Sequence, residues 1–246
     1  MKLPDFSTFA PFKELRTKMG IPADRTEPRS DEVRVETFYP MLPRAVVMFR
    51  SGAKLDLLDP QPDCWSDEDL AQNLARIARW GGATKWEFSL SVAQHSLMVL
   101  AIAGANAVLT PRQALRELLH DASEGLLGWD PIAPLKPELG TRFRNLEDRL
   151  QNAIARRYDL GCWSRETYAR HKHADRLAAA SEAFHVVGWT LDDMRDVLNI
   201  ELAPLSDCPL AAPEGFAAWQ PWPPALTERL FLHKLNLLKQ QATAAS

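Results

Sequence analysis

The chain has few cysteines, a small net charge and no long apolar run, and each scarcity excludes a class of protein. Its 246 residues include only three cysteines, which are far apart and form no CxxC pair. An odd number of scattered cysteines is typical of reduced thiols rather than of a disulfide scaffold. With 29 basic and 32 acidic side chains the net charge is −3, so no overall field favours nucleic acid or an anionic membrane. Any anionic ligand must therefore be held by a local site.

The longest apolar run, Leu97 to Leu109, is shorter than the roughly 20 residues needed to cross a bilayer. At the N-terminus, Pro4 and Asp5 interrupt what would be the apolar stretch of a signal peptide. Hydrophobic residues make up 46% of the chain and charged residues 25%, which excludes disordered, collagen-like and coiled-coil chains. We therefore expect a soluble, cytoplasmic protein with a substantial core, no membrane partner and no binding of DNA or RNA duplexes.

Residues 1 to about 60 are irregular and rich in proline. Their clearest pattern is the alternation of apolar and polar side chains at 33–38, followed by an apolar segment at 45–49. Alternation is typical of strands, so these two segments can pair as a short hairpin. We treat residues 1–53 as an N-terminal extension with a possible hairpin, and 54–246 as one mainly helical domain.

From Ser66 onward, apolar side chains recur at three- and four-residue spacing, which predicts helices and an all-α fold class. A capping-box pattern begins at Ser66, and the first helix should end near Gly81–Gly82. Another should start at Thr110–Pro111 and run to about Leu127. Six prolines near 204–224 predict a long surface connection. The further helices are expected at 92–107, 141–157, 164–187, 191–200 and 224–240.

Two of the six histidines lie within apolar helical patterns. His95 lies in one such helix, and His120 is followed directly by Asp121 in another. A buried imidazole beside a buried carboxylate is costly unless each is paired or bound to a metal. Asp175 has apolar neighbours in a later helix. Together these four side chains would offer two nitrogens and two carboxylates, a set suited to Mn, Co, Fe, Ni or Zn.

Glu124 follows His120 by four residues, so on a continuous helix it lies over the same face. From there its carboxyl can reach a metal-bound water without being a ligand, which makes it the natural general acid or base. The plainer alternative is that these histidines are satisfied core or surface residues, because a His-Asp pair alone is a weak signal.

Short motifs around these candidates carry a resemblance to a known family. They are Arg79-Trp80, Ser91 to Ser96 (SVAQHS), Leu118 to Glu124 (LLHDASE), Pro134-Leu135-Lys136 and Lys172 to Asp175 (KHAD). They resemble segments of the YfbR-type 5′-deoxynucleotidases, which are HD-domain metal-dependent phosphohydrolases. Residues 54–60 and Ser181-Glu182-Ala183 look closer to phage HD hydrolases related to dATP triphosphohydrolases. The resemblance covers about 54–187.

The resemblance implies a helical HD-domain bundle that holds one divalent ion, whether Co, Mn, Zn, Ni, Fe or Mg. Its ligands would be His95, His120, Asp121 and Asp175, and Glu124 would act with Asp121 in catalysis. The activity implied is hydrolysis of the phosphate ester of a deoxynucleotide, most simply a 5′-monophosphate. The partners implied are this small nucleotide substrate and, by a family tendency to dimerise, a second copy of the chain.

The same resemblance implies the substrate-binding residues. Arg79 and Lys136 would hold the phosphate, with Lys85 and Lys172 behind them. Trp80 would stack on the base or press against C2′ of the sugar, and a place in the core is the alternative. A carboxylate that contacts substrate in the family carries over to Asp130.

Two departures from the family pattern bear on the substrate. The chain has one residue more than the YfbR pattern between Trp80 and His95, and again between Gly128 and Pro134 beside Asp130. Close phage relatives usually have a histidine at the position of Ala83. A dNTP triphosphohydrolase that releases tripolyphosphate is therefore the first alternative.

Other function classes also stay open. A nucleotide-binding HD module without turnover, a metal-dependent oxygenase and a helical interaction protein are alternatives. The oxygenase would need more His and carboxylate ligands than we can assign. HD proteins that bind two or more metals generally carry further histidines between the His-Asp pair and the final aspartate, whereas residues 122–170 contain none. We therefore expect one metal and interpret His171, His173 and His185 as surface residues or as neighbours of the ligands.

Overall fold

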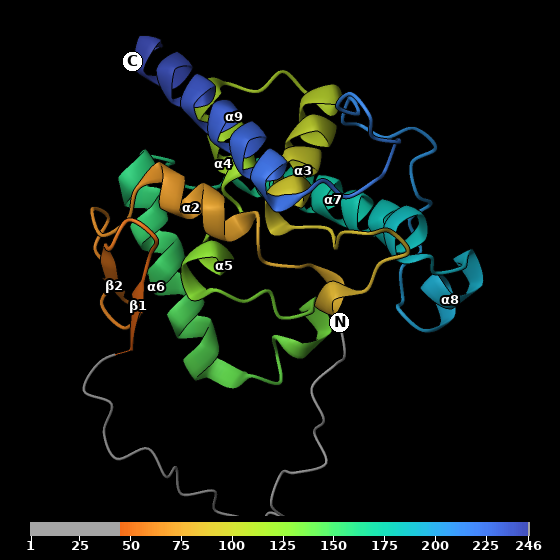
Figure 1. Cartoon of the computed structure of the whole chain (residues 1–246), viewed down its shortest axis with the longest axis horizontal. Coiled ribbons are helices and arrows are strands. Elements are labelled where there is room, and N and C mark those ends of the chain that lie inside the picture. Colours follow the sequence, from red (N-terminus) through yellow and green to blue (C-terminus); the bar gives the residue numbers. More distant parts are fainter. Residues whose placement is uncertain (1–44, 246) are drawn as a thin grey trace, which may run out of the picture. The chain divides into compact units, whose positions relative to one another are not determined.

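The computed structural model of the chain describes residues 45–245, which form mainly helices (Figure 1). The all-α class with a short hairpin near the N-terminus is confirmed. The chain divides into two units, 1–43 and 44–246, and the first lies outside the described residues. None of the helices within 45–245 is both long enough and apolar enough to span a membrane.

The hairpin consists of β1 (Val46–Met48) and β2 (Lys54–Asp56), which pair antiparallel with Val47 opposite Leu55. Leu55 is fully buried and anchors the hairpin in the helical core. The expected strand at 45–49 is therefore present, and among the described residues its partner is β2. The partner expected at 33–38 lies outside them, and the division of the chain at residue 53 stays a prediction.

The first helix, α2 (Asp67–Leu74), begins with the expected capping box at Ser66. The prediction that it continues to Gly81–Gly82 is wrong. After Leu74 the chain turns, and the Arg79 N–H donates to the carbonyl of Leu90 at 2.8 Å. Arg79 is extended, and the short 3₁₀ turn η2 (Trp80–Gly82) follows it.

The predicted helix at 110–127 is in fact two helices, α4 (Pro111–Leu118) and α5 (Ala122–Leu127). In a continuous helix the carbonyl of Glu117 would accept the N–H of Asp121. Here the imidazole Nδ1 of His120 contacts that carbonyl at 2.8 Å, and Asp121 leaves helical geometry with φ −102° and ψ 17°. The prediction of one continuous helix is therefore wrong at the His-Asp pair.

The other helices agree closely with the predicted ranges, except that α8 ends about four residues early and the helix expected at 164–187 finishes as the π-helical turn η4. Between α8 and α9, Trp219 and Trp222 are buried, so the proline-rich connection is not wholly at the surface. The elements are α3 (Val92–Asn106), η3 (Ala133–Leu135), α6 (Gly140–Tyr158), α7 (Arg165–Glu182), η4 (Ala183–Val187), α8 (Leu191–Asp196) and α9 (Pro224–Ala244).

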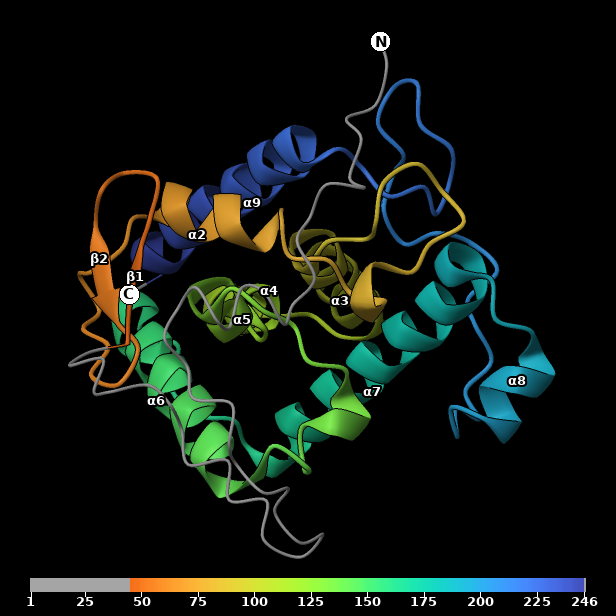
Figure 2. The same cartoon turned by 60° about the horizontal axis from the view of Figure 1, so that its bottom comes forward.

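Helices α4 and α5 lie at the centre of the helical arrangement in Figure 2, with α2 and α9 on one side, α6 on another and α3 and α7 opposite. The leucines of α2 and α4 pack with Phe231 and Leu235 of α9 in the largest core cluster. The break between α4 and α5 is therefore surrounded by helices, so polar side chains at the break are largely withdrawn from solvent.

Gly125 is where α5 approaches α2 most closely. A Cβ at this position would lie 2.7 Å from Cγ of Leu74, and overpacking of this kind costs about 1–3 kcal/mol. We expect Gly125→Ala to lower the free energy of unfolding by that amount, measured by urea titration. Gly104→Ala is the matched control, because Gly104 lies in α3 with open space around its Cβ position. An unchanged Gly125→Ala protein would contradict the packing described.

Asp67 ties the start of α2 to α6 and α9. Its carboxylate accepts hydrogen bonds from Tyr158 at 2.9 Å, Arg157 at 3.2 Å and Lys239. Burial opposes its charge, but Lys239, Tyr158 and Arg157 lower its pKa below the ordinary 3.8. A lowered pKa stabilises the fold above the unfolded-state value, and this stability is lost as pH falls through the folded-state value.

We therefore expect Asp67→Asn to lower the free energy of unfolding by about 1.5–3 kcal/mol at pH 7, the usual contribution of hydrogen bonds to a charged group. The difference from wild type should shrink as the pH falls below 3.8. Urea titrations at pH 7 and pH 3 measure both effects. Glu68→Gln removes an exposed charge from the same turn and serves as control. A difference that is as large at pH 3 as at pH 7 would argue against the charged contacts.

Candidate metal centre

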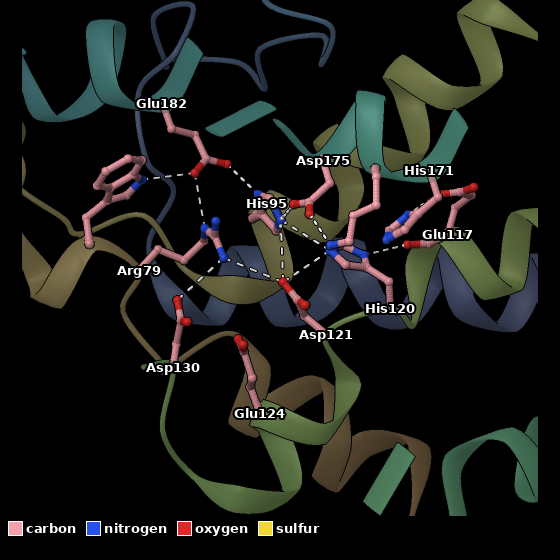
Figure 3. A network of polar contacts seen from close by, with 12 residues as sticks. Arg79, His95, Glu117, His120, Asp121, Glu124, Asp130, His171, Asp175 and Glu182 are labelled. Atoms are coloured by element: carbon pink, nitrogen blue, oxygen red, sulfur yellow. Dashed lines mark hydrogen bonds and ion pairs between the residues drawn. The ribbon is translucent and has the colours of Figure 1, made fainter. Parts of the chain in front are cut away.

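Three helical segments bring His95, His120 and Asp175 together around one point (Figure 3). His95 comes from α3, His120 from the break after α4, and Asp175 from the middle of α7. The Nε2 atoms of the two histidines are 3.2 Å apart, and Nε2 of His95 lies 3.4 Å from Oδ1 of Asp175. One ligand atom from each residue lies within 4.8 Å of the others, so this buried group can hold a metal ion.

Asp121 completes a set of four donors. Its Oδ2 lies 3.1 Å from Nε2 of His120 and 3.5 Å from Nε2 of His95. The break between α4 and α5 makes this possible, because it directs two consecutive side chains to the same side of the chain (Figure 3). Two imidazoles with two carboxylates form a mixed N/O set that suits borderline divalent ions. All four ligands expected from the sequence are thus brought together.

In both histidines Nδ1 is hydrogen-bonded on the side away from the centre, so that each ring turns Nε2 toward the centre. Nδ1–H of His120 donates to the main-chain carbonyl of Glu117 at 2.8 Å. Nδ1–H of His95 donates to Oε1 of Glu182 at 2.5 Å. A hydrogen bond at one ring nitrogen fixes the tautomer and leaves the other nitrogen free to bind a metal.

Glu182 is the main contact that sequence analysis missed. It is fully buried at the end of α7, and its second oxygen, Oε2, accepts from Nε of Arg79 at 3.1 Å and from the indole N–H of Trp80 at 3.0 Å. The available signal was its spacing: Glu182 follows Asp175 by seven residues, two helical turns along one face. The resemblance to phage hydrolases included Glu182 but gave it no role.

Glu117 was also missed, and it explains His171. The carboxylate of Glu117 lies 2.8 Å from Nδ1 of His171. His171 is buried, stacks on Trp163 and meets the ring of His120 edge-on at 4.9 Å. Of its two expected places, surface or neighbour of the ligands, it occupies the second. His173 is exposed, whereas His185 is half-buried and contacts the carbonyl of Leu205.

Buried groups of opposite charge lie close together in the centre and shift one another's pKa values. Burial and Arg79 disfavour a proton on His95, but Glu182 and Asp175 raise its pKa to about 10. Burial opposes ionisation of Glu182, yet His95 and Arg79 lower its pKa to about 2. The pKa values of Asp121 and Asp175 are also lowered despite burial, chiefly by the two histidines. The carboxylates are therefore charged and demand positive charge between them.

Glu124 lies in the first turn of α5 and is only 3% exposed. Its Oε1 accepts from Nζ of Lys136 at 3.1 Å, whereas Oε2 is buried and has no hydrogen-bond partner among the described residues. Burial and the charges of Asp121 and Asp130 raise its pKa well above the usual value. Figure 3 shows its carboxyl directed toward Asp121 and Asp130. Such an orphaned oxygen calls for a polar group of a ligand or a water.

Arg79 and Lys136, the side chains expected to bind phosphate, form ion pairs with carboxylates at or beside the centre. Nη1 of Arg79 lies 3.5 Å from Oδ2 of Asp121 and equally far from Oδ2 of Asp130. Lys136 pairs with Glu124 and, at 3.0 Å, with Glu147. Both cations are thus placed beside the metal-holding group, and Asp130 lies with them.

Trp80 and Lys85 are placed differently from each other. Trp80 is half-buried and packs against Ala180, Ala183 and Met194, and its backbone has a positive φ of 57°. Its place in a core cluster, given as the alternative, is therefore observed. Lys85 is exposed, and within residues 45–245 no ion pair joins it to the centre.

No protein-family model matches the chain. An uncharacterized protein of Rhodobacter capsulatus is 41% identical to it over 149 residues, which cover 60% of this chain and 76% of the relative. The chain therefore belongs to the same family as this uncharacterized Rhodobacter capsulatus protein.

Proposed function

We propose that this chain is a metal-dependent phosphohydrolase that cleaves the phosphate ester of 5′-deoxynucleoside monophosphates. The observation that carries the proposal is the position of Glu124. Its carboxyl, which has a buried oxygen without a partner among the described residues, is directed toward Asp121, beside the His95, His120 and Asp175 group that can hold a metal ion. Arg79 pairs with Asp121, and Lys136 pairs with Glu124. Water activation and phosphate binding need these components within one small, largely dry space.

The donors fit a divalent ion. Asp121, Glu124, Asp130, Asp175 and Glu182 place five carboxyl groups around the three cations Arg79, Lys136 and Lys172. A divalent ion would balance much of this excess negative charge. When bound, it supplies Lewis-acid activation of a water and of the phosphoryl group. Two imidazole ligands favour Mn, Co, Fe, Ni or Zn over Mg.

The side chains of the site divide the remaining work. Arg79 and Lys136 bind the phosphoryl oxygens, and an oxygen at the usual distance of about 2.7–2.9 Å would replace the long contacts of Arg79 with Asp121 and Asp130. Glu124 orients the attacking water through its free oxygen and takes the proton as the new P–O bond forms. Glu124 then gives this proton to the 5′-oxygen of the nucleoside as the ester bond breaks.

A deoxynucleoside monophosphate is the favoured substrate because of the motif resemblance and the position of the cations. Trp80 directly follows Arg79 and places an apolar ring near the phosphate-binding side of the centre. A triphosphate would need more positive charge, but Lys85 lies outside the contacts of the centre. A nucleotide-binding module without turnover is disfavoured, because it would have no need of the buried Glu124.

The metal dependence and the role of Glu124 are tested together. We expect the metal-stripped protein to release no phosphate, and reloading with Mn, Co, Zn or Mg to restore release from dNMPs in the presence of at least one of these ions. Glu124→Gln should lower kcat about 10²–10⁴-fold, the usual contribution of a general acid or base. Phosphate release from dNMPs, NMPs and dNTPs under each metal is the measurement.

Glu147→Gln is the matched control for Glu124→Gln, because Glu147 is the second carboxylate on Lys136, and within residues 45–245 no ion pair joins it to the proposed metal ligands. It should retain most of the activity. Tripolyphosphate released only from dNTPs would replace the nucleotidase with the triphosphohydrolase. If no phosphate were released from any of these nucleotides with any of the metals, the proposed hydrolase activity would be rejected in favour of a nucleotide-binding module without turnover.

Arg79 provides a second test. Arg79→Lys keeps the charge, but one ammonium cannot pair with Glu182 and also present a planar fork to phosphate. We expect KM for a dNMP to rise about tenfold or more, with a smaller change in kcat. Arg76→Lys is the matched control, since Arg76 is half-exposed and pairs with Glu228 away from the centre. Equal KM values for the two variants would contradict a role of Arg79 in phosphate binding.

A further inference from the structure

The Glu182 carboxylate contacts both His95, one of the two candidate metal-binding histidines, and Arg79, the arginine expected to bind phosphate. Oε1 meets Nδ1 of His95 at 2.5 Å, and Oε2 meets Nε of Arg79 at 3.1 Å. The carboxylate is fully buried, so solvent cannot replace either contact. Figure 3 shows it between the two groups.

The Glu182 carboxylate is fixed by its position on α7. It follows Asp175 by two turns, so both residues lie on the helix face that meets α3. Directly after Glu182 the helix widens into the π-helical turn η4, a feature frequent at functional sites. The main-chain N–H of Lys85 donates a hydrogen bond to the carbonyl of Val186 in η4 at 3.0 Å. This bond holds the loop after η2 against this end of α7.

The Arg79–Trp80 segment, which contacts Oε2 of Glu182, has a strained backbone. Trp80 has φ 57° in the left-handed region, which costs a non-glycine residue free energy unless its surroundings hold it there. The indole N–H bond to Oε2 of Glu182, at 3.0 Å, is one such constraint. Glu182 therefore fixes both the Arg79 guanidinium and the turn that carries it.

We propose that Glu182 is a positioning residue that orients His95 for metal binding and Arg79 for phosphate binding. The inference rests on the proposed function for its phosphate side, whereas its metal side stands on the contact with His95 alone. Glu182 accepts three hydrogen bonds and donates none. It thereby holds a proton on Nδ1 of His95 and turns Nε2 toward the group that can hold a metal ion.

Glu182→Gln separates this role from simple space filling. The carboxamide has nearly the same shape but only one oxygen, and that oxygen satisfies more donors when it faces Arg79 and Trp80. Its NH₂ group then faces His95 and favours the tautomer with the proton on Nε2, which cannot bind a metal. Loss of a carboxylate behind a metal-binding histidine typically costs about 10–100-fold in affinity.

We expect Glu182→Gln to weaken Zn²⁺ and Co²⁺ binding about 10–100-fold in the absence of nucleotide, measured by competition with a chromophoric chelator. Glu117→Gln is the matched control, because this buried carboxylate contacts His171 and no metal-holding side chain. Its metal affinity should stay near wild type. Equal affinities for wild type and folded Glu182→Gln would overturn the proposal.

The phosphate side is measured with metal at saturation. The Kd of inorganic phosphate, from calorimetry, should rise in Glu182→Gln because a neutral oxygen holds the guanidinium less firmly. Trp80→Phe removes one donor to Oε2 and leaves the contact with His95, so it should affect phosphate binding without weakening metal binding. An unchanged phosphate Kd in both variants would remove the phosphate side of the proposal.

A measurement on the wild-type chain covers the case in which the variants do not fold. In the Zn²⁺-loaded protein, long-range ¹H–¹⁵N spectra should show His95 protonated at Nδ1, with its signals identified by their loss in His95→Ala. A proton on Nε2 would overturn the proposal. Metal binding that is weakened by Glu182→Gln without any phosphate release from nucleotides would reject the proposed function and retain this inference.

Discussion

The His95 imidazole lies between two carboxylates of one helix, and the rest of the site depends on this arrangement. Asp175 and Glu182 are two turns apart on α7 and face opposite nitrogens of the ring. His95 itself is fully buried, so its polar groups have only protein partners. These contacts join α3 to α7, and His120 and Arg79 lie against the same group of side chains. A buried imidazole without these carboxylates would be strongly destabilising.

The remaining parts of the site come from places where regular structure stops. The helix expected at 110–127 breaks because the His120 ring takes a carbonyl that the backbone would otherwise use. The helix expected to reach residue 81 ends at Leu74, and beyond its end Arg79 pairs with Leu90 instead of continuing a helix. Each break exchanges helical hydrogen bonds for side-chain contacts with the centre. A regular helix through either segment would direct these side chains away from one another.

These breaks also explain how far the sequence predicts the structure. Caps and apolar periodicity are local signals, and they predict most of the helices, whereas the four candidate metal ligands are expected chiefly from the motif resemblance. The partner of His95 lies 87 residues away, and that of His171 lies 54 residues away, so no local pattern pairs them. A buried glutamate in an alanine-rich helix resembles an exposed one in sequence. The structure was therefore needed to find Glu182 and Glu117.

Charge balance links Glu124 to the side chains that can hold a metal ion. The pKa values of His95 and Glu124 are both raised, in part because several carboxylates share one buried space. A proton on either residue is one way to reduce this excess of negative charge, and a divalent ion at the four donors is another. His95 could hold such an ion only through an Nε2 that carries no proton, since a nitrogen that binds a metal cannot keep its proton. Under the proposed function, Glu124 would then be the residue that exchanges protons with a bound water, and its partner in the structure is Lys136.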